Sequence, residues 1–316
     1  MEVSMKRGMT LVEMLVSLTI MMIVLGAIYS VLNIQQTKSL NVQETSVLHT
    51  DAQVALTLLR WDLFMAGYGI ARHTPSIAST NNANAADQIT LRGVGLGFET
   101  DYTDWAPVIE RVSASNEILV YRFNDSTPAF EVGDTIIIVD QEKRLLDSNC
   151  VISQIDSIVH SVAEFTLDGF KLRIDRAISV DKGSLVFRPD RNTYGNGIDY
   201  TLVSNTLMRG NQVFLENVED IQFAYGVDLN DDGTFQDAEW FNELSSIPGY
   251  SPRMLYEHRT AIRSAFVMLS ERMLRDYNYP ADACTLEDHI YALSELDKKY
   301  KRNFVSAITW PRNIQD

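Results

Sequence analysis

The sequence predicts an α+β fold, in which one long N-terminal helix packs on an antiparallel β-sheet domain. Residues 9–66 contain no proline and a single glycine, Gly26, which favours an uninterrupted helix. The rest of the chain is rich in short β-branched and aromatic runs separated by Gly, Asp and Asn. One helix followed by many strands favours a helix laid on a sheet over alternating βα units.

The composition is that of a globular chain with an acidic surface. Of the 316 residues, 46% are hydrophobic and 22% are charged, which excludes wholesale disorder. The formal net charge is −15, so the chain repels the phosphates of nucleic acids. We therefore expect no nucleic-acid partner.

The N-terminal segment predicts a membrane span. No charged residue lies between Met14 and Thr37, and about 20 apolar residues suffice for a helix that crosses a bilayer. We place the span at about residues 14–34. Lys6 and Arg7 before it predict a cytoplasmic N-terminus, with the remaining chain outside the cytoplasm. Because no A-x-A-like cleavage site follows the span, we expect the helix to be retained.

Glu13 interrupts this apolar run close to its start. A carboxylate in a membrane is costly unless it is paired, so an ionisable residue there indicates function by default. The alternative is that Glu13 only snorkels to the membrane surface.

The residues around Glu13 resemble the prepilin signal of type IV pilin-like proteins. The letters KRG at residues 6–8 precede MTLVE at residues 9–13 and the apolar helix, at the spacing of that family. The resemblance implies that prepilin peptidase cleaves after Gly8 and methylates Met9, which stands where the family usually has phenylalanine. It also implies that Glu13 pairs with the methylated ammonium of a neighbouring subunit, so that two costly charges compensate each other.

The resemblance also implies a pilin-like domain plan and a location. Residues 1–8 are then a leader peptide, residues 9–66 the long helix, and residues 67–316 a β-rich extracytoplasmic domain. We expect a single-pass protein of the inner membrane with a periplasmic C-terminal domain. Its partners are prepilin peptidase and the other minor and major pilins, with which it enters a pilus or pseudopilus.

Beyond the membrane span, apolar residues recur at helical spacing from Val47 to Met65. We therefore expect one continuous helix about 85 Å long, at 1.5 Å per residue. Gly67 or Gly69 is the expected C-cap. The alternative is a membrane helix and a separate amphipathic helix, with a break near residues 33–36.

The rest of the domain is expected to consist mostly of strands. Residues 71–87 are small and polar and predict a loop, whereas residues 252–300 are rich in charge and look like an insertion with some helix near Leu286 to Lys299. The predicted strands are residues 88–92, 117–123, 135–139, 151–158, 184–188, 198–203, 212–215, 221–227 and 262–269.

Residues 200–228 resemble a segment of the PilW-like minor pilins, in which a short hairpin leads through an asparagine-valine turn into a strand with a tyrosine near its end. The residues that fit are Leu207, Arg209, Val218, Phe223 and Tyr225. This resemblance implies a minor type IV pilin that helps to initiate or cap pilus assembly. The GspJ-like minor pseudopilins of type II secretion share the leader and the general plan, and are the alternative.

Residues 228–239 match the spacing of a twelve-position calcium loop. The expected oxygen ligands are Asp228, Asn230, Asp232, the Thr234 carbonyl, Gln236 directly or through water, and Glu239. Gly233 allows the sharp turn, but the preceding residues alternate like a strand and not like the helix of an EF-hand. Calcium is therefore the expected cofactor, and the alternative is an acidic turn that binds nothing.

Nothing in the sequence predicts an enzyme. The chain lacks GxSxG, Walker A and HExxH motifs, and its five histidines are dispersed. A membrane-anchored extracytoplasmic enzyme is the alternative of a different class, and a minor pilin with an adhesive surface in residues 252–300 is compatible with the prediction. Cys150 and Cys284 form no CxxC pair. Outside the cytoplasm they are free to form a disulfide, with two buried thiols as the alternative.

Overall fold

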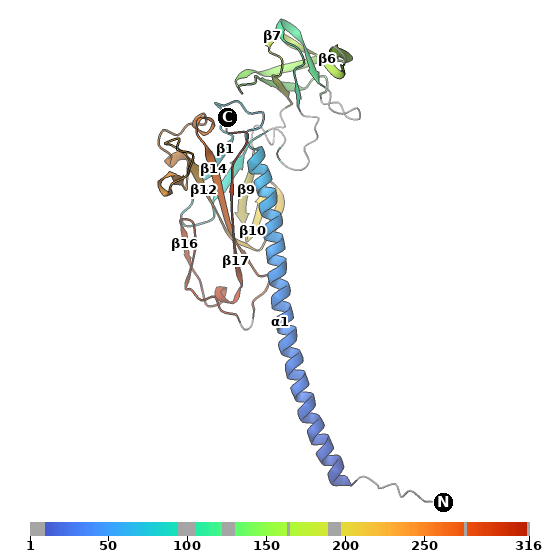
Figure 1. Ribbon diagram of the computed structural model, residues 1–316, viewed down its shortest axis with the longest axis vertical. Coiled ribbons are helices and arrows are strands. Elements are labelled where there is room, and N and C mark those ends of the chain that lie inside the picture. The colour runs from blue at the N-terminus through green and yellow to red at the C-terminus, as the bar shows by residue number, and fades with distance from the viewer. Residues whose placement is uncertain are drawn as a thin grey trace, which may run out of the picture.

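The computed structural model describes residues 10–93, 96, 105–121, 130–162, 165–188, 197–274 and 277–314. A long helix, α1 (Leu11–Met65), leads into a β-rich head, and the first half of α1 extends away from that head (Figure 1). All strand pairings of the described residues are antiparallel. The α+β prediction is therefore confirmed.

Helix α1 runs through 55 residues without a break, so the alternative of two helices separated near residues 33–36 is wrong. It ends at the C-cap Ala66, and Gly67 follows with a φ of 81°. This left-handed conformation suits glycine, and the Gly67 N–H donates to the carbonyl of Arg92. Gly69 has a different role, because a Cβ there would come within 2.5 Å of the Phe187 ring.

The second half of α1 packs on the head through one face. Its buried apolar residues recur every three or four positions, which places them on one side of a helix. They are Leu48, Ala52, Ala55, Leu59 and Leu63. They share one hydrophobic core with residues of two sheets, and Figure 1 shows β17 alongside this part of α1.

One of these sheets has five strands in the order β1-β2-β9-β10-β11. Its strands are β1 (Ile77–Thr80), β2 (Gln88–Leu91), β9 (Ile198–Val203), β10 (Thr206–Arg209) and β11 (Gln212–Glu216). The other has four strands in the order β13-β12-β14-β17. They are β12 (Val218–Val227), β13 (Trp240–Phe241), β14 (Thr260–Leu269) and β17 (Arg302–Thr309).

A third sheet is inserted into the five-stranded sheet, because the chain leaves at β2 and returns at its neighbour β9. Its strands follow the order β3-β8-β5-β6-β7-β4. They are β3 (Trp105–Pro107), β4 (Val112–Tyr121), β5 (Thr135–Val139), β6 (Leu145–Val162), β7 (Phe165–Val180) and β8 (Leu185–Phe187). Its two edges meet where Val108 bridges Val120, so the sheet closes into a small barrel.

The barrel has a hydrophobic core of its own and stands at the end of the head that is far from the N-terminal half of α1 (Figure 1). Aromatic side chains connect it to the end of α1. The ring of Tyr68 contacts those of Trp105 and Phe187 edge to face, at centroid distances of 5.5 and 5.8 Å.

All nine predicted strands are present, although residues 122 and 123 of one of them lie outside the described residues. Other strands, including β7 and β17, were not predicted, and two regions have a different secondary structure from the predicted one. The loop expected at residues 71–87 contains β1. The helix expected near Leu286 to Lys299 is instead the hairpin of β15 (Ala283–Leu286) and β16 (His289–Ala292), followed by the single 3-10 turn η4 (Asp297–Lys299). Residues 252–300 also contain the short helix α2 (Met254–Glu257) and the core strand β14.

Candidate functional site

The first turn of α1 is closed by a capping box between Thr10 and Glu13. The Glu13 N–H donates to Thr10 Oγ1 at 3.3 Å, and the Thr10 N–H donates to Glu13 Oε2 at 2.9 Å. The Thr10 hydroxyl also donates to this carboxylate, at 3.1 Å. Each side chain thus satisfies a backbone N–H that the helix itself leaves unpaired.

This arrangement holds the Glu13 carboxylate at the N-terminal end of the helix, where the helix dipole favours negative charge. Gly8 and Met9 lie outside the described residues, and Thr10 follows Met9 directly. Sequence reasoning singled out Glu13 and missed Thr10, although the T-x-x-E pattern before an apolar run is the signal of a capping box.

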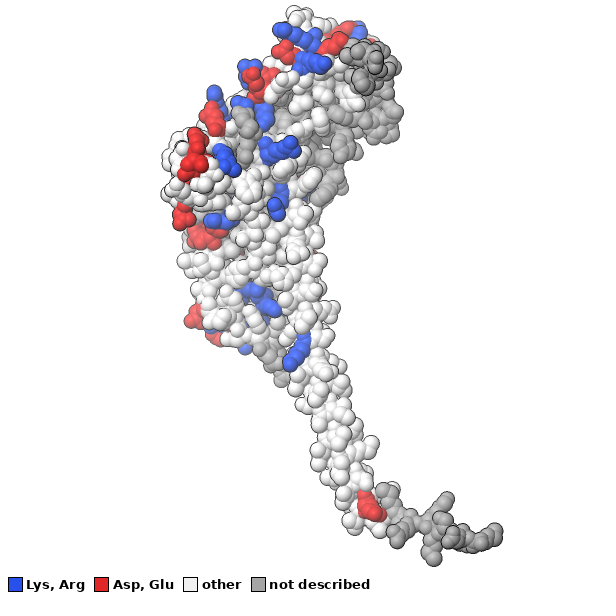
Figure 2. Space-filling view, viewed as in Figure 1, with Lys and Arg blue, Asp and Glu red and all other residues white. Residues whose placement is uncertain are grey.

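The helix beyond Glu13 presents an apolar surface on all sides. All residues from Leu11 to Ile34 are exposed, and Figure 2 shows the part of this stretch beyond Glu13 as an uncharged rod. By length and composition α1 is able to cross a membrane, and none of its most apolar stretch is buried against the head. This exposure fits a membrane anchor.

Ion pairs fix the second half of α1 to the head at two points. Near the end of the helix, Arg209 Nε of β10 and the Tyr200 hydroxyl of β9 both contact Oδ2 of Asp62, each at 2.6 Å. Nearer the membrane span, Arg272 Nε lies 2.7 Å from Oε1 of Glu44. The head is therefore attached to α1 along most of its second half.

The predicted calcium loop connects β12 to β13 and is closed by its own hydrogen bonds. Asp228, which is 1% exposed, accepts from the N–H groups of Asp232 and Gly233. Glu239 accepts from the N–H groups of Leu229 and Gln236. Side chains within the loop also contact each other, since Asn230 and Gln236 donate to Asp232 Oδ2 and Thr234 donates to Oδ1.

These bonds leave further lone pairs on each carboxylate, and hard oxygens of this kind suit calcium. However, no group of three or more His, Cys, Asp or Glu side chains among the described residues is arranged to hold a metal ion. The loop is closed by its own hydrogen bonds, and calcium binding stays a prediction.

Cys150 and Cys284 are free and buried in two different hydrophobic clusters. Cys150 lies in the core of the barrel, and Cys284 lies on β15, on the buried face of the β15–β16 hairpin. The disulfide that the sequence allows is therefore not formed in the structure. Sequence could not reveal this separation, because it gives no distance between the two Cα atoms.

Comparison with protein families gives one match, to the prokaryotic N-terminal methylation motif at residues 3–29. This stretch contains the residues at which cleavage and methylation are expected, the capping box and the first part of the apolar helix. No curated protein and no solved structure matches the chain.

The motif implies processing by prepilin peptidase and assembly with other pilins, and it suggests a structural role without catalysis. The exposed apolar helix that contains most of the motif fits anchoring in a membrane. The chain thus carries a prepilin-type methylation motif on a long N-terminal helix. This combination is consistent with a type IV pilin-like protein.

Proposed function

We propose that this protein is a minor type IV pilin of the PilW-like kind, which helps to initiate or cap a pilus. The observation that carries the proposal is the combination of an exposed apolar helix with a Glu13 carboxylate held at its first turn. The helix supplies the surface by which subunits associate, and Glu13 supplies one charge at a defined axial position on the helix.

The proposed mechanism has four steps. The apolar helix inserts into the inner membrane, and prepilin peptidase cleaves after Gly8. Met9 is then methylated at its new N-terminus, and helices of neighbouring subunits associate. During association, the Glu13 carboxylate of one subunit pairs with the terminal ammonium of another, which fixes the axial register because two unpaired charges in an apolar core are costly.

The size and shape of the head support a low-copy position. Besides the two sheets that pack on α1, the head contains the inserted barrel, which enlarges it at the end far from the N-terminal half of the helix (Figure 1). A filament shaft repeats one subunit at short intervals, and a large head is difficult to accommodate at every position. A tip or priming position has no such limit.

The GspJ-like pseudopilins are the second candidate, because they share the leader and the general plan. Deleting the gene in the native host, counting surface pili by electron microscopy and assaying secreted proteins in the same cultures separates the two. The proposal predicts lost pili, normal secretion, and restoration of pili by the wild-type gene. Intact pili with failed secretion would instead assign the protein to a type II secretion pseudopilus.

A further inference from the structure

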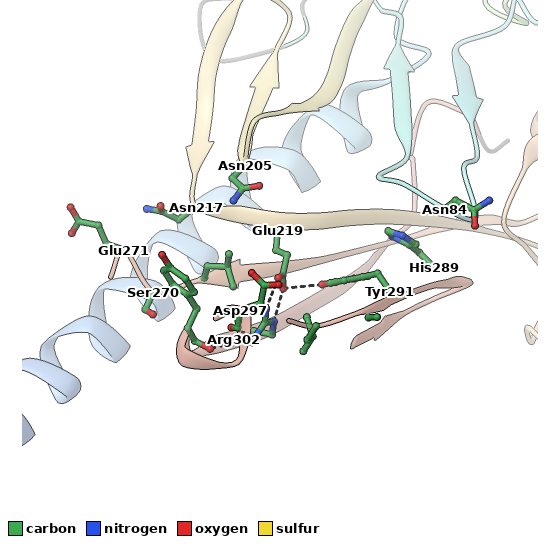
Figure 3. A pocket seen from close by; sticks show the side chains of 14 residues that line it. Asn84, Asn205, Asn217, Glu219, Ser270, Glu271, His289, Tyr291, Asp297 and Arg302 are labelled. Carbon is green, nitrogen blue, oxygen red and sulfur yellow. Dashed lines mark hydrogen bonds and ion pairs between the residues drawn. The ribbon is translucent and has the colours of Figure 1, made fainter. Parts of the chain in front are cut away.

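A polar pocket of about 590 Å³ lies where the β15–β16 hairpin meets the turns of the two sheets that pack on α1 (Figure 3). Its volume is in the range of ligand sites, about 300–1,000 Å³. It adjoins a second hollow beside α1, since Asn217 and Glu271 contribute to the walls of both. Neither the membrane helix nor the methylation motif contributes to its lining.

Three asparagines from three different turns line this pocket: Asn84, Asn205 and Asn217. Backbone bonds hold two of these turns in place, because the Asn205 carbonyl accepts from Val218 N at 2.9 Å and the Asn217 carbonyl accepts from Leu269 N at 2.7 Å. Within the described residues, none of the three side-chain amides has a hydrogen-bond partner. Their donors and acceptors are therefore available to a ligand.

A buried histidine contributes a further polar group. His289 is 8% exposed, and its Nδ1 lies 2.9 Å from Oδ2 of Asp220, which is itself 1% exposed. The buried carboxylate favours the tautomer with the proton on Nδ1, which leaves Nε2 as an acceptor. No partner of Nε2 is present among the described residues, and the imidazole forms part of the pocket wall.

The charges around the pocket exclude an anionic ligand. Arg302 is the one cationic residue of the lining, and its side chain has no exposed surface. It is held by the carboxylate of Glu219, which also accepts from the hydroxyl of Tyr291 (Figure 3). Glu271 and Asp297 add negative charge, so a phosphate or carboxylate would be repelled.

The remaining groups suit a hydroxyl-rich neutral ligand. Each amide offers one acceptor and two N–H donors, and a hydroxyl group both donates and accepts. The rings of His289 and Tyr291 lie side by side on β16 at a centroid distance of 5.0 Å, and Tyr300 adds a third ring to the wall. Such rings present an apolar face on which the C–H groups of a sugar ring are able to pack.

We propose that this pocket binds a neutral saccharide, with the asparagine amides and the His289 imidazole as hydrogen-bonding groups. This activity goes beyond the proposed role in assembly, and it depends neither on cleavage after Gly8 nor on Glu13. A subunit with this pocket carries a sugar-binding site on its head, next to the point where α1 joins it.

The test uses the full chain in a detergent without a sugar headgroup, and saturation-transfer NMR with neutral disaccharides, including maltose, lactose and N,N′-diacetylchitobiose. A tetralysine peptide and a sugar phosphate serve as comparison probes. The proposal predicts saturation transfer to at least one neutral disaccharide and none to the sugar phosphate. No transfer to any of the disaccharides at millimolar concentration, or binding of tetralysine alone, would overturn it.

Two variants of one turn test whether the sugar binds in the pocket. Asn205→Gly removes an amide at a position with a φ of 61°, where glycine introduces no strain. Ser204→Gly changes the neighbouring residue, which has a φ of 49° and does not line the pocket. We expect about fivefold weaker binding for Asn205→Gly, the effect of one lost neutral hydrogen bond, and unchanged binding for Ser204→Gly. Equal affinity of Asn205→Gly and the wild type would contradict the assignment.

Discussion

Arg209 Nε of β10 lies 2.6 Å from Oδ2 of Asp62, in the last turn of α1. The Asp62 side chain is 3% exposed and also accepts from the Tyr200 hydroxyl. A buried carboxylate requires such partners, and these two lie on neighbouring strands of one sheet. The network therefore fixes how far along the sheet the helix lies, and with it the distance between the head and the membrane span.

Asp62→Ala should strongly destabilise the head, because it leaves the Arg209 charge and the Tyr200 hydroxyl without their shared acceptor. Breaking a buried ion pair by removing one partner costs about 3 kcal/mol. Denaturant unfolding of the full chain measures this loss. Asp51→Ala on the exposed side of the same helix is the matched control, and it should change the free energy of unfolding little. Equal stability of the two variants would contradict the role of the network.

Asp87 should make the stability of the head depend on pH. Burial raises the pKa of Asp87 to about 6, and the carboxylates of Asp288 and Asp220 add to the shift, whereas N–H donors from Phe223 and Asn82 oppose it. Since the folded state then holds the proton more tightly than the unfolded state, stability decreases as pH rises from about 4 to 6. This effect amounts to at most about 3 kcal/mol.

Asp87→Asn removes the titrating group, so the variant should lose this part of the pH dependence. Unfolding free energies of the wild type and the variant at pH 4.5 and pH 7 provide the comparison. The difference between the unfolding free energies of the wild type and the variant should change with pH. At pH 4.5 the wild type should gain stability relative to the variant. A constant difference would show that Asp87 does not titrate in this range.

The loop at residues 228–239 should respond to calcium if the predicted ligands bind it. We expect a chelator to lower the melting temperature of the full chain, and Asp228→Ala to abolish this difference. Asp228→Ala also removes two acceptors of loop N–H groups, so its absolute stability should fall with or without the ion. Asp237→Ala, outside the predicted ligand set, should keep the calcium response. A melting temperature indifferent to calcium in the wild type would refute the site.

Processing should produce a mature chain that begins at Met9 and carries one N-terminal methyl group. Mass spectrometry of the N-terminal peptide from membranes of the native host measures both changes. A substitution of Gly8 by a bulky residue should leave the leader attached, since the peptidase must reach the bond after this residue. Cleavage at another position would contradict the assignment of residues 1–8 as the leader.

Helix α1 could be predicted almost to its ends, because a proline-free run of this length with one glycine has few other structures open to it. The β15–β16 hairpin could not be predicted from the sequence. Leu286, Ile290 and Leu293 follow helical spacing, so the pattern favoured a helix. The turn instead forms at Glu287, which adopts a φ of 50° without the Asn-Gly or Asp-Gly signal of such turns.

The barrel could not be predicted from the sequence either. Strand β7 alternates between buried and half-buried positions along part of its length, but charged residues and Gly169 interrupt its β-branched pattern. More fundamentally, closure depends on the meeting of β3 and β4, and no local pattern encodes a contact of this kind. The pocket could not be predicted for the same reason, since its asparagines come from three separate turns.

Glu13→Gln tests the central claim most directly, because it separates the charge of Glu13 from its hydrogen bonds. Glutamine at this position still accepts from the Thr10 N–H and so preserves the capping box. The measurement is the amount of variant protein in sheared filaments relative to the membrane fraction, compared with the wild type in the same host. The account predicts normal membrane levels of Glu13→Gln and its loss from filaments. Wild-type incorporation of Glu13→Gln would contradict the pairing of Glu13 with a neighbouring N-terminus.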